Sequence, residues 1–174
     1  MKLNFIHTRK NAGTSIMDFL DRAEVDHCVS DYNLEEIEDY VSFAVKRNPY
    51  TRCISSWKYC SSTKNRDLLD CLNNPPQPED VYEDRPDLRP GHDYRHFTQT
   101  QSQFIFNNGV GPTHILSFEH LERDLQQMCL LYKIPFVKLN KLNVGKYDYK
   151  LGNDEREKIY QFYEEDFYNL GYSK

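Results

Sequence analysis

The sequence predicts an α/β fold with a mostly parallel central sheet, because short strand-like runs alternate with helical segments. Residues 2–7 have strand character and lead through a polar loop into a helical pattern at 14–24. The apolar, β-rich run at 41–45 is typical of a buried strand in a parallel sheet. A strand at 113–118 and an amphipathic helix at 119–132 repeat the pattern further along the chain.

The remaining elements follow from the same periodicities and from turn-forming residues. Five prolines between Asn73 and Arg95 indicate a long irregular loop within one domain spanning 1–174, and its length suggests a function beyond mere connection. We also expect an extended piece at 26–30, a short strand at 135–139, and helices at 33–40, 50–60, 68–72 and 96–106. A last helix is expected to begin with Asp154 as its cap, to run to about Tyr168 and to stop at Gly171.

Composition narrows the classes of function. Thirteen Tyr and ten Phe argue against a disordered chain, and a net charge of -5 argues against a general nucleic-acid binder. The five cysteines form no Cys-x-x-Cys pair and the six histidines are scattered, so we expect no metal site. No apolar run approaches a membrane span and no signal peptide is visible, so the expected location is soluble and cytoplasmic.

The rest of the chain is organised around the stretch at 5–16, which joins the first strand to the first helix. The backbone N–H groups of Gly13, Thr14 and Ser15 and the positive end of the helix dipole point out of this helix start. Lys10 adds a positive charge, so we expect a bound phosphate here. The stretch is not a Walker A loop, because its lysine precedes its only glycine. The alternative is a plain helix start, capped by Thr14 or Ser15.

A second anion site is expected just after the strand at 41–45. Arg47 offers a planar guanidinium that suits a phosphate, and Ser55 follows about two helical turns later. Arg52 is a further candidate, although it can equally pair with a surface carboxylate. Ligands of parallel sheets bind beyond the carboxyl ends of the strands, so Arg47 is expected at the same edge as the loop at 5–16.

Four stretches carry a resemblance to a known family. Residues 5–16 read Phe-Ile-His-Thr-Arg-Lys-Asn-Ala-Gly-Thr-Ser-Ile, similar to the pattern F-x-H-x-P-K-T-A-G-T-S. The second stretch is Arg47-Asn-Pro-Tyr-Thr-Arg-Cys-Ile-Ser55, similar to R-N-P-x-x-R-x-x-S. Residues 96–105 and 115–125 are similar to H-x-x-P-Q-S-x-F-I and I-L-x-Y-E-x-L-x-x-D-L. These patterns are those of the PAPS-dependent sulfotransferases, particularly the carbohydrate (family 2) branch, so the chain resembles that family over most of its length.

The resemblance implies a P-loop-like three-layer sandwich and an in-line transfer that needs no metal. A sulfuryl group passes from 3′-phosphoadenosine 5′-phosphosulfate (PAPS) to an acceptor hydroxyl or amine, leaving 3′-phosphoadenosine 5′-phosphate (PAP). Lys10 matches the lysine that steadies the leaving phosphate, and Arg47 and Ser55 match the 3′-phosphate ligands. The loop that holds the 5′-phosphate corresponds to Lys10, Asn11, Ala12, Gly13, Thr14 and Ser15. Two positions depart from the pattern: Arg9 replaces a usual proline and Asn11 a usual threonine.

The acceptor hydroxyl must lose a proton as it attacks, and histidine is the usual base near neutral pH. His27 is the first candidate, because several members of the resembled family carry a catalytic histidine at a similar distance before the Arg-Asn-Pro motif. His96 is the second, since it begins the third similar stretch. His7 is expected to be structural. Lys146, in a polar loop at 140–153, is expected near the phosphates, with a solvated lysine as the alternative.

These features together predict a sulfotransferase that moves the sulfuryl group of PAPS to a hydroxyl, most simply on a carbohydrate. Two alternatives stay open. One is a P-loop kinase-like phosphotransferase, which the missing Walker lysine disfavours. The other is a PAP-binding protein that has lost catalysis. The acceptor's identity and the oligomeric state do not follow from the sequence.

Overall fold

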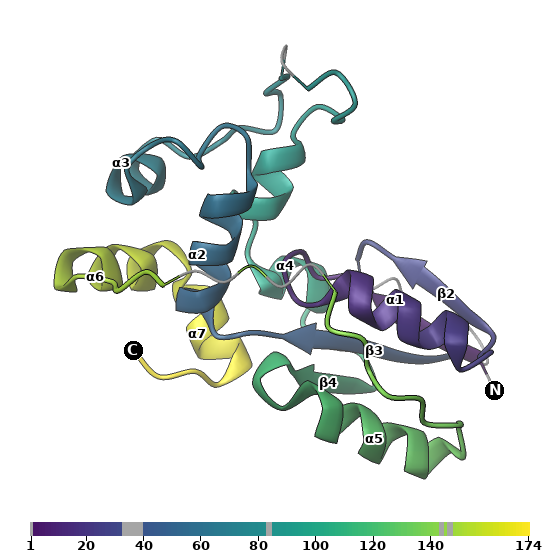
Figure 1. The fold of residues 1–174 in the computed structure, drawn as a ribbon. Coiled ribbons are helices and arrows are strands. Elements are labelled where there is room, and N and C mark those ends of the chain that lie inside the picture. Colours follow the sequence, from purple (N-terminus) through teal and green to yellow (C-terminus); the bar gives the residue numbers. More distant parts are fainter. Residues whose placement is uncertain (1, 33–39, 83–84, 143–144, 146–147) are drawn as a thin grey trace. The chain divides into compact units, whose positions relative to one another are not determined.

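The computed structural model describes residues 2–32, 40–82, 85–142, 145 and 148–174 (Figure 1). The chain divides into two compact units, each built from two stretches. The sheet unit comprises residues 1–47 and 101–144, and the helical unit comprises residues 48–100 and 145–174. Each unit is described by itself below, and a single domain over 1–174 stays a prediction.

The sheet unit contains four strands in the order β2-β1-β3-β4, and all three strand pairings are parallel. The strands are β1 (Lys2–Ile6), β2 (His27–Ser30), β3 (Tyr40–Lys46) and β4 (His114–Ser117). The helices of this unit are α1 (Gly13–Arg22), α4 (Gln101–Ile105) and α5 (Leu121–Tyr132). The predicted α/β class is thus confirmed, with a parallel sheet flanked by helices, an arrangement consistent with a three-layer sandwich.

The core of the sheet unit is an apolar cluster formed by one face of the sheet with α1 and α5. Leu3 and Phe5 alternate along β1 with Asn4 and Ile6, and the two-residue period of a strand sends the two pairs to opposite faces. Leu3 and Phe5 pack in the cluster with Phe19 of α1 and with apolar residues of α5. Figure 1 shows both helices running beside the strands. Burial of these side chains holds β1, and therefore the loop that follows it, in place.

The prediction of a strand at 135–139 is wrong, because this segment is not assigned to a strand. This segment runs along α1 instead, with the ring of Phe136 centred 5.9 Å from that of Phe19. Further on, the N–H of Leu142 donates to the Oγ of Ser15 at 3.0 Å. The apolar side chains of the segment pack on the core of the sheet unit beside α1, so they are buried although the segment pairs with no strand.

The helical unit contains α2 (Pro49–Tyr59), α3 (Leu68–Asn73), α6 (Asn153–Phe162), α7 (Glu164–Leu170) and a π-helical segment at Tyr94–Thr98. Its core is a second cluster rich in aromatic and cysteine side chains. The Asn-Pro pair of the second similar stretch begins α2. The side chain of Asn48 accepts from the N–H of Tyr50 at 3.0 Å, and Pro49 occupies the first helical position.

Two helices expected from periodicity are each interrupted. The pattern at 96–106 is split, because the π-helical segment ends at Thr98 and α4 begins only at Gln101. The last helix is split at Tyr163, whose buried hydroxyl donates to the carbonyl oxygen of Phe97. The break at Tyr163 coincides with this long-range hydrogen bond, which a local periodicity does not contain.

The ends of the last helical region test the capping predictions. Asp154 does not cap the region, because Gly152 occupies the cap position and α6 begins at Asn153. Gly171 follows α7 in the left-handed conformation, with φ 69°, as the stop predicted from the sequence. The helix expected at 33–40 falls almost wholly outside the described residues.

Candidate anion-binding site

The strand order of the sheet reverses at β1, because β2 lies on one side of it and β3 on the other. In open parallel sheets, ligands bind at such a reversal, beyond the carboxyl ends of the strands. Here those ends are Ile6 of β1 and Lys46 of β3, which are followed by the loop at 7–12 and by Arg47. Topology therefore brings Lys10 of the loop and Arg47 to one edge of one unit, as the sequence predicted.

The loop between β1 and α1 has an unusual backbone. Lys10 and Ala12 are both left-handed, with φ 66° and φ 64°, a conformation that costs a non-glycine residue about 1–3 kcal/mol. The first hydrogen bond of α1 runs from Ile16 N–H to the carbonyl of Ala12 at 3.0 Å. Ala12 occupies the cap position without a side-chain cap, so the alternative of capping by Thr14 or Ser15 does not hold. A left-handed residue followed by a right-handed one turns successive N–H groups into an anion-binding concavity.

His7 explains why residue 13 is glycine. A Cβ at Gly13 would lie 2.1 Å from the Nε2 atom of His7, far inside contact distance. The Nδ1 atom of His7 accepts a hydrogen bond from Arg9 at 2.9 Å, because a guanidinium can only donate. Burial, and then the charge of Arg9, lowers the pKa of His7 to about 4. The ring is therefore neutral at pH 7, which agrees with the structural role expected for it.

Arg9, which replaces the usual proline of the resembled motif, ties the loop to the end of β2. Its guanidinium donates to Asp31 at 2.6 Å as well as to His7. Asp31 follows Ser30, the last residue of β2. These two hydrogen bonds supply a restraint on the loop that a proline ring would otherwise supply through its fixed φ.

A buried glutamine joins the loop to the end of β3. The Nδ2 of Asn11 donates to the carbonyl of Val45 at 2.7 Å and to the Oε1 of Gln101 at 2.6 Å. Gln101 also accepts from the N–H of Arg47 at 2.8 Å and donates to the carbonyl of Arg47 at 2.9 Å. The side-chain nitrogen of Asn11 thus serves the fold. Sequence reasoning missed Gln101, whose only signal was the Gln-Ser pair of the third similar stretch.

The guanidinium of Arg47 lies against the loop itself. Its NH1 donates to the carbonyl oxygen of Lys10 at 2.8 Å, and its central carbon lies 4.2 Å from the ring centroid of Phe118. The hydrogen bond holds Lys10 in its left-handed conformation, and the ring fixes the plane of the guanidinium. Two cationic residues therefore share this edge of the sheet.

The loop contains buried polar side-chain atoms that have no hydrogen-bond partner among the described residues. Among them are the Oγ1 of Thr8 and the Oδ1 of Asn11, in residues that are 1% and 0% exposed. An unsatisfied buried polar group costs about 1–3 kcal/mol, so each such atom calls for a ligand or a water. The Thr8 hydroxyl can donate to an anion. Ser15 can do so as well, because its Oγ accepts from Leu142 and keeps its own hydrogen.

Three other predicted site residues do not belong to the described part of the sheet unit. Ser55 is buried on α2, and His96 lies in the π-helical segment, so both belong to the helical unit and their roles stay predictions. Lys146 falls outside the described residues. Leu142, in the part of the polar loop that belongs to the sheet unit, donates its N–H to the Oγ of Ser15.

His27 is not brought to the loop. It begins β2 and pairs in register with Leu3, near the amino end of β1, whereas the loop follows Ile6 at the carboxyl end. Three strand residues at about 3.3 Å each separate the two ends. The Nδ1 of His27 donates to the carbonyl of Val25 at 2.8 Å. This placement speaks against His27 as the base.

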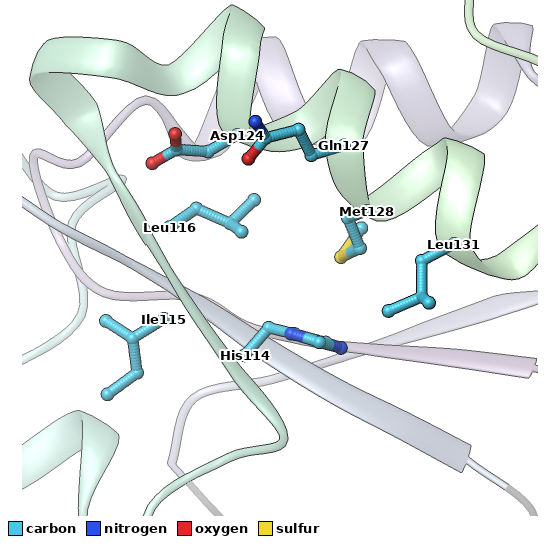
Figure 2. Close-up of a pocket in the computed structure, with 7 residues that line it drawn as sticks. All are labelled: His114, Ile115, Leu116, Asp124, Gln127, Met128 and Leu131. Carbon is cyan, nitrogen blue, oxygen red and sulfur yellow. The ribbon is translucent and has the colours of Figure 1, made fainter.

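A pocket of about 410 Å³ lies in another part of the sheet unit. Figure 2 shows that its lining comes from β4 and α5, with Met128 and Leu131 on the helix and His114 on the strand. The Nε2 of His114 is hydrogen-bonded to the hydroxyl of Tyr132 at 2.7 Å. None of the predicted site residues lines this pocket, so the candidate site rests on the loop at the switch point.

In comparisons with known proteins, no protein-family model, curated protein or solved structure gives a significant match to the chain. Within the part of the chain that the structure describes, no three His, Cys, Asp or Glu side chains are grouped to hold a metal ion. Over the same described ranges, none of the helices has both the length and the apolar character needed to cross a bilayer.

Proposed function

We propose that the chain is a sulfotransferase that holds PAPS by the loop between β1 and α1 and transfers its sulfuryl group to a carbohydrate hydroxyl. One observation carries the proposal. α1 begins beyond the carboxyl end of β1, where the strand order of the parallel sheet reverses, and the left-handed Ala12 is its cap residue. At the same edge, the guanidinium of Arg47 donates a hydrogen bond to the carbonyl of Lys10. This combination of N–H groups and cations suits a phosphate-bearing donor.

The residues of the loop fit the donor that the motifs imply. The N–H groups of Gly13 and Ser15 precede the first hydrogen bond of α1, and the unpartnered Thr8 hydroxyl adds a donor. Arg47 brings a second cation, suited to a second phosphate. PAPS when bound would supply the sulfuryl group and a phosphate leaving group. The Oδ1 of Asn11 can only accept, so it matches a donor group of the ligand or a water.

The chain's contribution to the reaction is electrostatic. Charge accumulates on the departing phosphate, and N–H groups and a lysine that are already oriented stabilise that charge without reorganising. The backbone of Lys10 is held by its hydrogen bond from Arg47, which keeps the start of this side chain at the loop. The proton acceptor for the hydroxyl is a separate question. Of the two predicted bases, His27 lies at the wrong end of the sheet, so His96 is the remaining candidate.

Transfer is tested by following PAP release from PAPS in the presence of neutral and acidic oligosaccharides. We expect release that depends on one class of acceptor and that falls by about 10²–10³ in kcat for Lys10→Ala, as when one transition-state donor is removed. The matched control is Lys64→Ala, an exposed lysine of the helical unit, which should leave the rate unchanged.

Each alternative function has its own signature. Binding of PAP without release from PAPS on any acceptor would favour a binding protein that has lost catalysis. Binding of ATP without binding of PAP would favour the kinase-like alternative. A Lys10→Ala variant that transfers at the wild-type rate would contradict the role given to this lysine.

A further inference from the structure

The helical unit contains a cluster of titratable side chains that includes His96, one of the two predicted bases. His92 and His96 are four residues apart, on the short helical stretch that includes the π-helical segment. Their ring centroids are 4.1 Å apart and their planes differ by 30°. The ring of Tyr59 packs against both, at 5.8 Å from His92 and 5.1 Å from His96.

The hydrogen bonds of the two rings fix their tautomers. The Nδ1 of His92 lies 2.7 Å from the Oδ1 of Asp93, and the Nδ1 of His96 lies 2.8 Å from the carbonyl oxygen of His92. A carboxylate and a carbonyl can only accept, so both Nδ1 atoms carry the hydrogen. In each neutral ring, Nε2 is then the nitrogen with the lone pair.

The carboxylate of Asp93 is held by hydrogen bonds on both of its oxygens. Its side chain is fully buried, and its Oδ2 accepts from both the N–H and the hydroxyl of Ser62 at 2.8 Å. A buried carboxylate on the Nδ1–H of a histidine is the arrangement that orients metal-ligating imidazoles and raises their basicity.

We propose that His92 and His96 form a two-histidine chelate for a divalent late transition-metal ion, binding through their Nε2 atoms. Imidazole nitrogen suits Cu²⁺, Ni²⁺ and Zn²⁺, whereas Mg²⁺ prefers oxygen. Metal–nitrogen bonds of about 2.0–2.1 Å bring two ligand atoms to ~3 Å from each other, a spacing within reach of rings whose centroids are 4.1 Å apart. Water completes the coordination, because no third protein ligand is grouped with the pair among the described residues.

The site does not depend on the sulfotransferase proposal, and a calorimetric titration of the untagged chain with the metal chlorides tests it. We expect one saturable site for Cu²⁺, Ni²⁺ and Zn²⁺, tightest for Cu²⁺, and none for Mg²⁺. His92→Gln and His96→Gln should each abolish this site. His120→Gln, at an exposed histidine of the sheet unit, should leave it intact.

The role of Asp93 is tested separately. Asp93→Asn should weaken binding by about 10–100-fold, as is typical when the partner of a ligating histidine is lost. Ser62→Ala removes one of the two hydrogen bonds that Ser62 donates to the same carboxylate and should weaken binding much less. Circular dichroism of each variant reports whether the fold is retained.

One further measurement does not depend on variants that fold. The electron paramagnetic resonance spectrum of the wild-type chain with one equivalent of Cu²⁺ should show two nitrogen ligands. A spectrum with oxygen ligands alone would overturn the proposal. So would an absence of saturable binding by the wild type, or binding that survives in a folded chain with both histidines replaced.

Discussion

Gly13 is the residue at which the geometry of the loop is most sensitive to a single methyl group. A helical Gly→Ala change normally stabilises a protein by about 0.5–1 kcal/mol. Here the added Cβ would meet the His7 ring at 2.1 Å, so we expect Gly13→Ala to destabilise the fold by about 1–3 kcal/mol. Urea unfolding measures the sign directly.

The matched control for this change is Gly152→Ala. A Cβ there meets only a carboxylate oxygen of Glu155 at 3.6 Å, an ordinary contact, so its effect should be much smaller. In a His7→Ala background the clash is gone, and the cost of Gly13→Ala should largely disappear. Equal costs of Gly13→Ala in both backgrounds would show that His7 is not the reason for the glycine.

His7 also makes stability depend on pH. Burial lowers its pKa from 6.5 to about 4, so the folded chain binds fewer protons than the unfolded chain between these values. The contribution is fully present above pH 6.5 and is lost as the pH falls toward 4. It amounts to roughly 3 kcal/mol at most. We expect His7→Gln, which keeps an acceptor for Arg9, to flatten this part of the stability profile.

The measurement is urea unfolding at pH 7, 5.5 and 4.5 for the wild type and His7→Gln. The two stability curves should converge as the pH falls. Parallel curves would mean that His7 titrates normally in the folded chain. Subtracting one curve from the other removes the contributions of the other histidines to the free energy of unfolding, because both proteins contain them.

At the scale of elements, α5 offers a test of which face holds the sheet. Leu125 is fully buried in the core of the sheet unit, whereas Leu130 on the same helix is 81% exposed. Leu125→Ala should therefore cost about 2–5 kcal/mol and Leu130→Ala less than about 0.5 kcal/mol, measured by urea unfolding. Similar costs at the two positions would contradict the packing of this helix.

The strands and helices that the sequence predicted correctly are those whose apolar residues have one clear burial partner. The strand at 41–45 and the helix at 119–132 are of this kind, and both appear as β3 and α5. The strand prediction at 135–139 was wrong because an apolar run can be buried against a helix as well as in a sheet. The break at Tyr163 depends on a long-range hydrogen bond to Phe97, which local periodicity cannot contain.

At the scale of the whole molecule, the sequence placed the charged residues of the site and missed those that hold them. Lys10 and Arg47 were predicted at one edge because each follows the carboxyl end of a strand expected in a parallel sheet. Gln101, which brackets the backbone of Arg47, comes from a stretch 54 residues away and carried only a weak signal. His27 was chosen by distance along the chain, a measure that does not tell which end of a parallel strand a residue occupies.

The central claim is that the loop and Arg47 bind a nucleotide with a 3′-phosphate. Thermal unfolding with PAP, ADP and ATP, for the wild type and Arg47→Ala, tests this claim most directly. At a hundred times its dissociation constant, PAP should stabilise the wild type by about 2.7 kcal/mol, or roughly 5–10 °C in Tm. Arg123→Ala, at a largely exposed arginine of α5, is the matched control.

The account predicts a large shift with PAP, a small one with ADP, loss of the PAP shift in Arg47→Ala, and a full shift in Arg123→Ala. A shift with ATP but none with PAP, or a PAP shift that Arg47→Ala leaves unchanged, would contradict it.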